Sequence, residues 1–261
     1  MFASRKKRPV PYSTILAFLL TIFFSSPSVG TQKSQVFMQL ADEAYQKFDN
    51  FNALAYAKKA YKIEPKNFES LAKMVRAYND IGEDLNSKES EGYFEQAVRG
   101  AEQLFEQFPD KAETYYLLAV SYGNLALLKG GKEKVKLSGY IEKNARKAIE
   151  LKPDYADAYV VLGIYYKEVA SLNSFLKAFA RFFLGELPDG SYDDAVKTLQ
   201  RAIELQTTNP VYTYFHLGYT YEQMEEFEKA KASYQHALQL PLIDHQDPAV
   251  KRQIHSRMRK L

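Results

Sequence analysis

The four histidines, His216, His236, His245 and His255, are the residues of this chain whose chemistry best suits proton transfer or metal binding. None stands in an H-E-x-x-H pattern, and none pairs with another histidine four residues away. The chain contains no cysteine, which excludes disulfides, thiolate metal sites and a cysteine nucleophile. We therefore expect no metal site.

Other patterns that support catalysis are also missing. No serine, histidine and aspartate stand out as a nucleophilic constellation, and no Gly-rich nucleotide fingerprint occurs. The acidic pairs Asp193-Asp194 and Glu225-Glu226 stand where helices are expected to begin, and carboxylates there interact favourably with the helix dipole. The sequence predicts a protein that is not an enzyme and needs no cofactor.

A lysine-rich segment offers a different chemistry. Lys129, Lys132, Lys134 and Lys136 surround Gly130-Gly131, and such a cluster could bind phosphate or anionic lipid head groups. The segment lacks the spacing of a phosphate-binding loop. We favour a solvated loop.

Helix pairs must position any site on this chain. The 34 residues from Val211 to Asp244 carry the tetratricopeptide spacing of aromatic, small and apolar residues. Gly218 and Ala230 are expected to face each other where two antiparallel helices cross closely, so neither can be large. The other positions that fit the pattern are Tyr214, Leu217, Tyr221, Tyr234 and Ala237.

Similar units begin near Gln35, Phe68, Ala112 and Ala156. The last three are about 10 to 20 residues longer than the 34-residue frame, and in the second unit the excess lies in a polar connection around residues 82–90. We predict an all-α, right-handed tetratricopeptide-repeat superhelix, an α-α solenoid of about five helix pairs with elongated helices, over residues 31–244. A basic C-terminal cap helix is expected over residues 245–261.

The concave surface of such an array is lined mainly by the first helix of each pair. Its aromatic and polar side chains suit an extended peptide or a helix. The alternative is that some of them contact an inserted helix and belong to the core. The expected partner-binding residues are Lys73, Arg76, Tyr116, Val120, Asn124, Ile164, Lys167, Phe215, Tyr219 and Gln223.

An amphipathic helix is expected within the insertion of the fourth unit, over residues 175–184. Its apolar stripe lies opposite Lys177 and Arg181, which is typical of helices that face lipid or a partner. We favour the alternative of a plug folded against the superhelix, although a plug that lines a cavity also leaves room for an acyl chain. The residues that would face lipid are Phe175, Phe179, Phe182 and Phe183.

Residues 1–30 have the pattern of a secretory signal peptide. The basic segment Arg5-Lys6-Lys7-Arg8 precedes an apolar run, Ser13–Phe24, and the small residues Ser28-Val29-Gly30 suit cleavage before Thr31. The alternative is an uncleaved signal-anchor. Removing the four basic charges from the formal net charge of +3 leaves −1, which argues against nucleic-acid binding.

The segments Gly131–Pro153 and Val160–Leu205 resemble the regulator of microtubule dynamics family. The shared features are a lysine-rich entry, the helix end AIELKP, a helix with Leu162-Gly163, and a turn at FLGELP, residues 183–188, where the family often has a first proline in place of leucine. The resemblance covers roughly residues 70–242. It implies the repeat fold, an association with microtubules and with mitochondrial or endoplasmic-reticulum membranes, and in one branch lipid handling. Because the leader predicts export, we expect this chain to share the family's fold and do not expect its association with microtubules or with organelle membranes.

The sequence favours a non-catalytic, exported scaffold, periplasmic or secreted, that binds a protein segment in its concave groove. The alternative is a protein that binds lipid or another apolar ligand in a cavity between the array and the helix over residues 175–184. Membrane contact is expected only through the N-terminus or a peripheral helix, and no nucleic-acid partner is expected.

Overall fold

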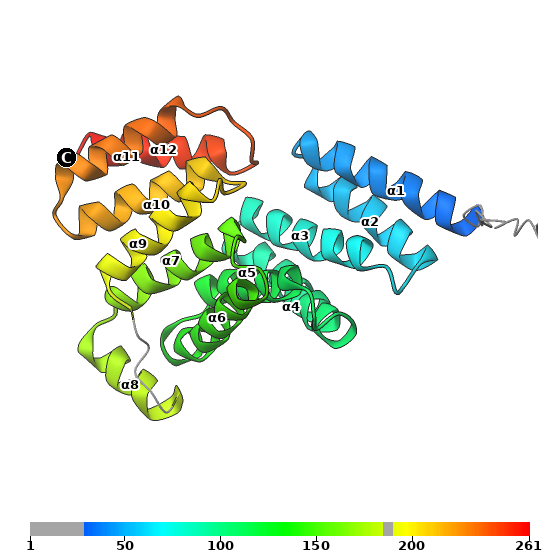
Figure 1. Ribbon diagram of the computed structural model, residues 1–261, viewed down its shortest axis with the longest axis horizontal. Helices are drawn as coiled ribbons and strands as arrows, with labels where there is room; N and C mark the ends of the chain where they lie inside the picture. The colour runs from blue at the N-terminus through cyan, green and yellow to red at the C-terminus, as the bar shows by residue number, and fades with distance from the viewer. Residues whose placement is uncertain (1–28, 185–189) are drawn as a thin grey trace, which may run out of the picture.

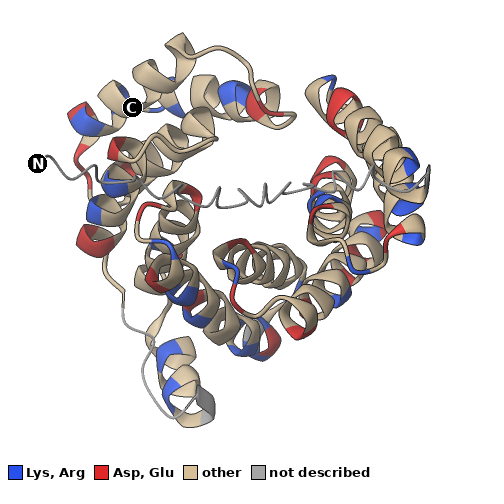
Figure 2. Ribbon diagram, turned by 45° about the vertical axis from the view of Figure 1, so that its right-hand side comes forward, with Lys and Arg blue, Asp and Glu red and all other residues tan. Residues whose placement is uncertain are grey.

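The computed structural model describes residues 29–184 and 190–261, so the predicted leader lies outside the described residues except for its last two. Helices pair in antiparallel fashion and wind around a central space (Figures 1 and 2), which confirms the predicted all-α tetratricopeptide superhelix. The five pairs are α1 (Val29–Gln46) with α2 (Asn50–Ile63), α3 (Phe68–Asp84) with α4 (Ser87–Gln107), α5 (Ala112–Leu128) with α6 (Gly131–Leu151), α7 (Ala156–Ala170) with α9 (Tyr192–Glu204), and α10 (Pro210–Gln223) with α11 (Phe227–Gln239).

Small residues allow the paired helices to approach closely. A Cβ atom built on Gly218 of α10 would lie 2.7 Å from the ring of Tyr234 and 3.2 Å from the carbonyl oxygen of Ala230, both on α11. A Cβ atom built on Gly163 of α7 would likewise lie 2.7 Å from the side chain of Leu199 on α9. The structure therefore confirms the predicted crossing of Gly218 and Ala230, and the fourth pair repeats it.

Polar caps fix where the helices begin. Asn67 and Asn209 accept hydrogen bonds from the backbone N–H groups of Ser70 and Tyr212, and Pro210 occupies the first turn of α10. Ser191 and Asp194 form a reciprocal capping box at the start of α9. These caps stand where the sequence predicted helix starts.

In the second and third units, the residues in excess of the 34-residue frame extend the helices and do not form long loops. Only residues 85–86 separate α3 from α4, and only residues 129–130 separate α5 from α6. The prediction of a solvated lysine-rich loop was therefore wrong beyond Gly130. Val135 is buried and Lys134 pairs with Glu168 of α7 at 3.4 Å, so the segment gains contacts as a helix that it would lack as a loop.

Two helices stand outside the pairs. Helix α8 (Ser174–Leu184) lies between α7 and α9 in the chain, packs against α6 and projects from the array (Figure 1). Helix α12 (Asp247–Met258) packs on α10 and α11 at the C-terminal end, where Val250 and Ile254 enter the core. In the described part of the chain, no helix is both long enough and apolar enough to cross a bilayer.

A charged group is buried where α7 meets α10. Nζ of Lys167 lies 3.2 Å from Nδ1 of His216 and 3.1 Å from a carboxylate oxygen of Glu168. Burial lowers the pKa of His216 well below its ordinary value, and the positive charges of Lys167 and Arg257 lower that pKa further. His216 is therefore neutral in the folded protein at neutral pH.

Replacing Gly218 by alanine should destabilise the fold by about 1–3 kcal/mol, because the new methyl group would overlap the Tyr234 ring. The control is Gly92→Ala on α4, where a Cβ meets nothing within 4 Å and the gain in helix propensity should stabilise by about 0.5–1 kcal/mol. Urea denaturation followed by circular dichroism measures both changes. Equal stability of the two variants would contradict the close crossing.

The buried His216 should make stability depend on pH in weakly acidic solution. Its folded pKa is depressed, so the unfolded chain takes up the proton first as the pH falls below about 6.5, and stability is lost at a slope of at most about 1.4 kcal/mol per pH unit. Lys167, Arg257 and the phenol of Tyr212 surround the ring.

We expect His216→Gln to flatten the dependence of the unfolding free energy between pH 7 and 5, compared with His255→Gln, which removes an exposed histidine of α12. Denaturant titrations at several pH values give the two slopes. The same slope in both variants would show that His216 does not carry the effect.

Candidate ligand-binding groove

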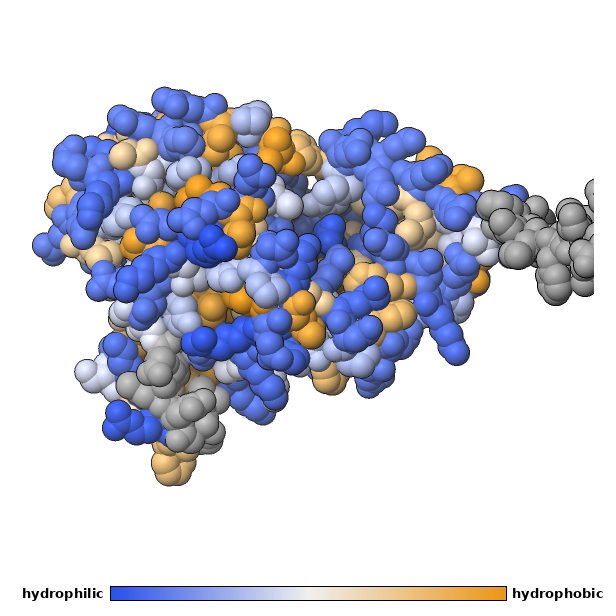
Figure 3. All heavy atoms as spheres, viewed as in Figure 1, coloured by the Kyte–Doolittle hydropathy of each residue, from blue (hydrophilic) through white to orange (hydrophobic). Residues whose placement is uncertain are grey.

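A groove of about 790 Å³ runs along the concave side of the superhelix. Side chains of α3, α5 and α7 form most of its wall, and α6, α8, Tyr45 of α1, Tyr212 of α10 and the segments that precede α10 and α12 also line it. Figure 3 shows the hollow between the N-terminal helices on the right and the C-terminal helices on the left.

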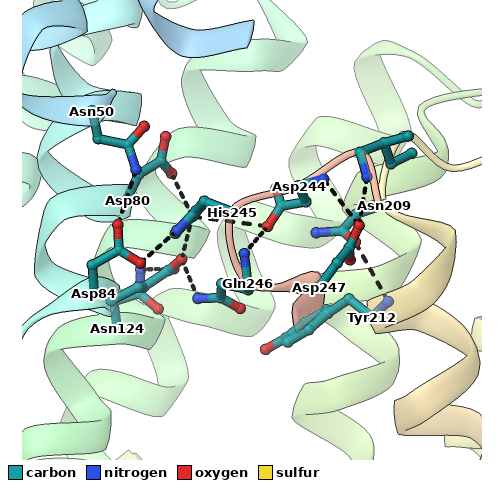
Figure 4. Close-up of polar contacts among 12 residues, drawn as sticks. Asn50, Asp80, Asp84, Asn124, Asn209, Tyr212, Asp244, His245, Gln246 and Asp247 are labelled. Atoms are coloured by element: carbon teal, nitrogen blue, oxygen red, sulfur yellow. Dashed lines mark hydrogen bonds and ion pairs between the residues drawn. The ribbon is translucent and has the colours of Figure 1, made fainter. Parts of the chain in front are cut away.

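The groove is closed on one side by residues 240–246, which connect α11 to α12 and are called the closing segment below. The buried carboxylate of Asp247 accepts hydrogen bonds from the backbone N–H groups of Ile243 and Asp244, at 2.8 and 2.9 Å. These bonds hold the segment in a tight turn that directs His245 toward α3 (Figure 4). The C-terminal end of the array is thus joined to its second helix pair.

Acidic residues of α3 receive the closing segment. Nδ1 of His245 lies 2.8 Å from Oδ1 of Asp84, and Gln246 hydrogen-bonds Glu83. Burial by itself would lower the pKa of His245, but the carboxylates of Glu83, Asp80, Asp244 and Asp84 raise it to about 10. Burial and the negative charge of Glu83 raise the pKa of Asp80 well above its ordinary value.

One part of the groove is polar and rich in tyrosine. Arg76 of α3 forms an ion pair with Glu113 of α5 at 2.7 Å, and the rings of Tyr116 and Tyr155 lie 5.1 Å apart beside it. Burial raises the pKa of both tyrosines, so their hydroxyl groups remain neutral at physiological pH. These groups offer hydrogen bonds to polar atoms of a ligand.

The other part of the groove is apolar. Val120 and Leu127 of α5 face it together with Ile164 of α7, and Leu172 and Leu176 approach from the start of the α8 insertion. A wall that is apolar at one place and polar at another favours an elongated ligand with both kinds of surface.

Five of the ten residues predicted to bind a partner line this groove, and five do not. Phe215 is only 7 % exposed and packs in the core, and Tyr219 stacks on it beneath Arg257 of α12, whose guanidinium lies 3.8 Å from the Tyr219 ring. The groove contains Arg76, Tyr116, Val120, Asn124 and Ile164, whereas Lys73, Lys167, Phe215, Tyr219 and Gln223 lie outside it.

The physical reason is that the cap helix and neighbouring repeats cover part of the expected surface. Helix α12 packs against α10 and occupies the space in front of Phe215 and Tyr219. Lys167 is buried against His216, and Lys73 pairs with Asp42 of α1. Gln223 is exposed at the end of α10.

The predicted lipid-facing residues of α8 point in different directions. Phe175 and Phe182 are 71 % and 83 % exposed, whereas Phe179 is partly buried beneath the ammonium of Lys132. Leu176 of the same helix lines the groove. The side chain of Phe183 lies outside the described residues.

Sequence reasoning missed the residues that shape the two ends of the groove. His245 and Asp84 stand 161 positions apart, and a search for local histidine patterns does not bring them together. Tyr45, Glu113 and Tyr155 also line the groove, but they lie outside the repeat positions considered. The acidic run Asp80–Asp84 beside a lone histidine in the last connection is the only signal that pointed toward such a contact.

Comparison with solved structures places the chain among tetratricopeptide proteins. The crystal structure of TTC0263, a thermophilic tetratricopeptide protein of Thermus thermophilus, is 19 % identical, with a TM-score of 0.63 over 86 % of this chain and 98 % of that one. MamA of Desulfovibrio magneticus RS-1, residue 41 to its end, is 15 % identical, with a TM-score of 0.47 over 80 % and 94 %. At 19 % identity the likeness to TTC0263 shows that the two proteins share a fold, and it carries no conclusion about function. No curated protein matches the chain by sequence.

The family comparison reaches further along the chain than the resemblance seen in the sequence. The profile of the family described as regulator of microtubule dynamics protein 1-3 matches residues 37–261. The match includes most of the first helix pair, the α8 insertion, the closing segment and the cap helix. The chain therefore belongs to the regulator of microtubule dynamics protein 1-3 family.

Proposed function

We propose that the protein is a non-catalytic scaffold that binds a segment of another protein in the groove. The observation that carries this proposal is the groove itself, an elongated cavity of about 790 Å³ built from the first helices of successive repeats. A hydrogen-bonding part at Arg76 and Tyr116 and an apolar part at Val120 and Ile164 suit a peptide with polar and apolar side chains in sequence.

The groove also constrains how such a segment binds. Arg76 is already paired with Glu113, so a ligand carboxylate must share or replace that partner. The apolar wall at Val120, Leu127 and Ile164 needs no such exchange and is the better source of binding free energy. We infer that apolar side chains anchor the segment and that the tyrosines and Arg76 select its register.

We further propose that the chain is exported, to the periplasm or outside the cell, with residues 1–30 removed as a signal peptide. The basic segment, the apolar run of moderate length and the small residues before Thr31 support this proposal. The alternative is a protein that keeps the leader as a membrane anchor.

The groove proposal predicts that Val120→Glu abolishes partner binding, because an unpaired carboxylate would be buried in the apolar wall. The matched control is Val36→Glu, the same change at a residue of α1 that is 52 % exposed. Each full-length variant is expressed in its own host, cross-linked and affinity-purified, and captured proteins are quantified by mass spectrometry.

We expect a partner that the wild type and Val36→Glu recover equally, and a loss of at least about tenfold with Val120→Glu at unchanged helicity. Equal recovery of that partner by Val120→Glu would contradict binding in the groove.

The export proposal predicts a mature chain that begins at Thr31. The intact mass of the denatured protein, purified from its own host, distinguishes a cleaved chain from one that keeps residues 1–30. A full-length mass would favour the membrane anchor. The native spectrum of the same sample also reports bound molecules, and a stoichiometric lipid there would count against a peptide as the ligand of the groove.

A further inference from the structure

The contact between the closing segment and α3 contains more negative charge than its one histidine can balance. The carboxylates of Asp80, Glu83, Asp84 and Asp244 all have an oxygen within 3.8 Å of a ring nitrogen of His245. Among the described residues, no lysine or arginine forms an ion pair with these four carboxylates, which we call the acidic cluster. A divalent cation would balance the cluster better than a single imidazolium.

An unpartnered buried carboxylate points to the same conclusion. Asp80 is only 8 % exposed, and its Oδ2 atom is buried without a hydrogen-bond partner among the described residues. Its Oδ1 atom lies 3.7 Å from Nε2 of His245, too far for a hydrogen bond, and Figure 4 shows the two side chains directed toward each other. A buried carboxylate in this situation is costly unless it takes up a proton or a cation reaches it.

The spacing of the ligand atoms fits a tetrahedral metal ion. One ligand atom each from Asp80, Glu83 and His245 lies within 4.8 Å of the other two. Nε2 of His245 is 3.4 Å from Oε2 of Glu83 and 3.7 Å from Oδ1 of Asp80. Ligands about 2.1 Å from a tetrahedral zinc ion stand about 3.4 Å from one another, so the side chains would draw closer to the ion, and Glu83 would exchange its hydrogen bond from Gln246 for the ion.

The outer contacts also resemble those of a metal site. Nδ1 of His245 lies 2.8 Å from Oδ1 of Asp84. Because an ionised carboxylate only accepts hydrogen bonds, Nδ1 carries a proton that it donates to Asp84. With its raised pKa the ring also carries a proton on Nε2 while no metal is bound, and a metal ion would displace that proton and bind Nε2. A carboxylate that orients a histidine through its second nitrogen is the usual arrangement around protein-bound metals.

We propose that Asp80, Glu83 and His245 bind one divalent transition-metal ion of the zinc class. Asp84 positions the imidazole, and Oδ1 of Asp244, which lies 3.8 Å from Nε2 and accepts a hydrogen bond from the backbone of Gln246, offers a fourth ligand. The imidazole nitrogen distinguishes this site from the all-oxygen sites that magnesium and calcium prefer. The ligands line the groove, which gives the ion a path from solvent.

The proposed ion would join two distant parts of the chain. Asp80 and Glu83 belong to α3, whereas His245 belongs to the closing segment. Metal binding would therefore hold the closing segment on α3 and fix the width of the groove. This role is independent of which ligand the groove accepts.

Isothermal titration of Zn²⁺ into the full-length chain, prepared without a histidine tag and treated with chelator, tests the proposal. We expect one Zn²⁺ per chain for the wild type and for the control His255→Ala, which removes an exposed histidine of the neighbouring helix. His245→Ala and Asp80→Asn should weaken binding at least about tenfold, and Asp84→Asn by about 10–100-fold. Mg²⁺ at the same concentration should not compete.

A second readout separates metal binding from a purely structural role of these residues. Zn²⁺ should raise the thermal unfolding midpoint of the wild type and of His255→Ala, and it should not raise that of Asp80→Asn. Asp80→Asn keeps the size and shape of the side chain, so the fold without metal should be kept, as circular dichroism will show. Absence of Zn²⁺ binding by the wild type, equal binding by His245→Ala, or equal competition by Mg²⁺ would overturn the proposal and leave an ion pair between His245 and the acids.

Discussion

The close crossing of paired helices at small residues is the constraint on which the rest of the structure depends. Gly163 and Gly218 allow a leucine and a tyrosine of the partner helix to pack directly on the backbone, and alanines line the other side of each crossing without exposed surface. Each helix pair packs on its neighbours along the chain, and an array of stacked pairs curves because of the small rotation at each step. The groove exists because of that curvature.

The curvature brings the C-terminal end of the array to its second helix pair, and polar contacts then decide how the two meet. The closing segment is held in shape by Asp247 and presents His245 to Asp80, Glu83 and Asp84 on α3. An open repeat array would leave its concave face to solvent, whereas here residues 243–246 of the segment line one side of the groove. The same contact thus shapes the binding surface and supplies the candidate metal ligands.

The elongated helices and the α8 insertion distinguish this array from a series of equal repeats. Helices α4 and α6 extend beyond the common repeat length, and Val135 and Lys134 of the extension contact the core and α7. Leu176 of α8 reaches the groove, while Phe175 and Phe182 remain exposed on the outer side. The insertion therefore narrows the apolar part of the groove and adds an apolar outer surface.

The sequence by itself determined the helix pairs, their caps and the crossing of Gly218 with Ala230, because these depend on residues within one repeat. It also indicated the groove positions of the middle repeats, such as Val120 and Ile164. Only the tertiary structure decided that α12 covers Phe215 and Tyr219 and that His245 meets residues 161 positions away. Those contacts depend on how far the array turns between its first and its last helix pair. A short sequence pattern describes one pair and does not determine that total rotation.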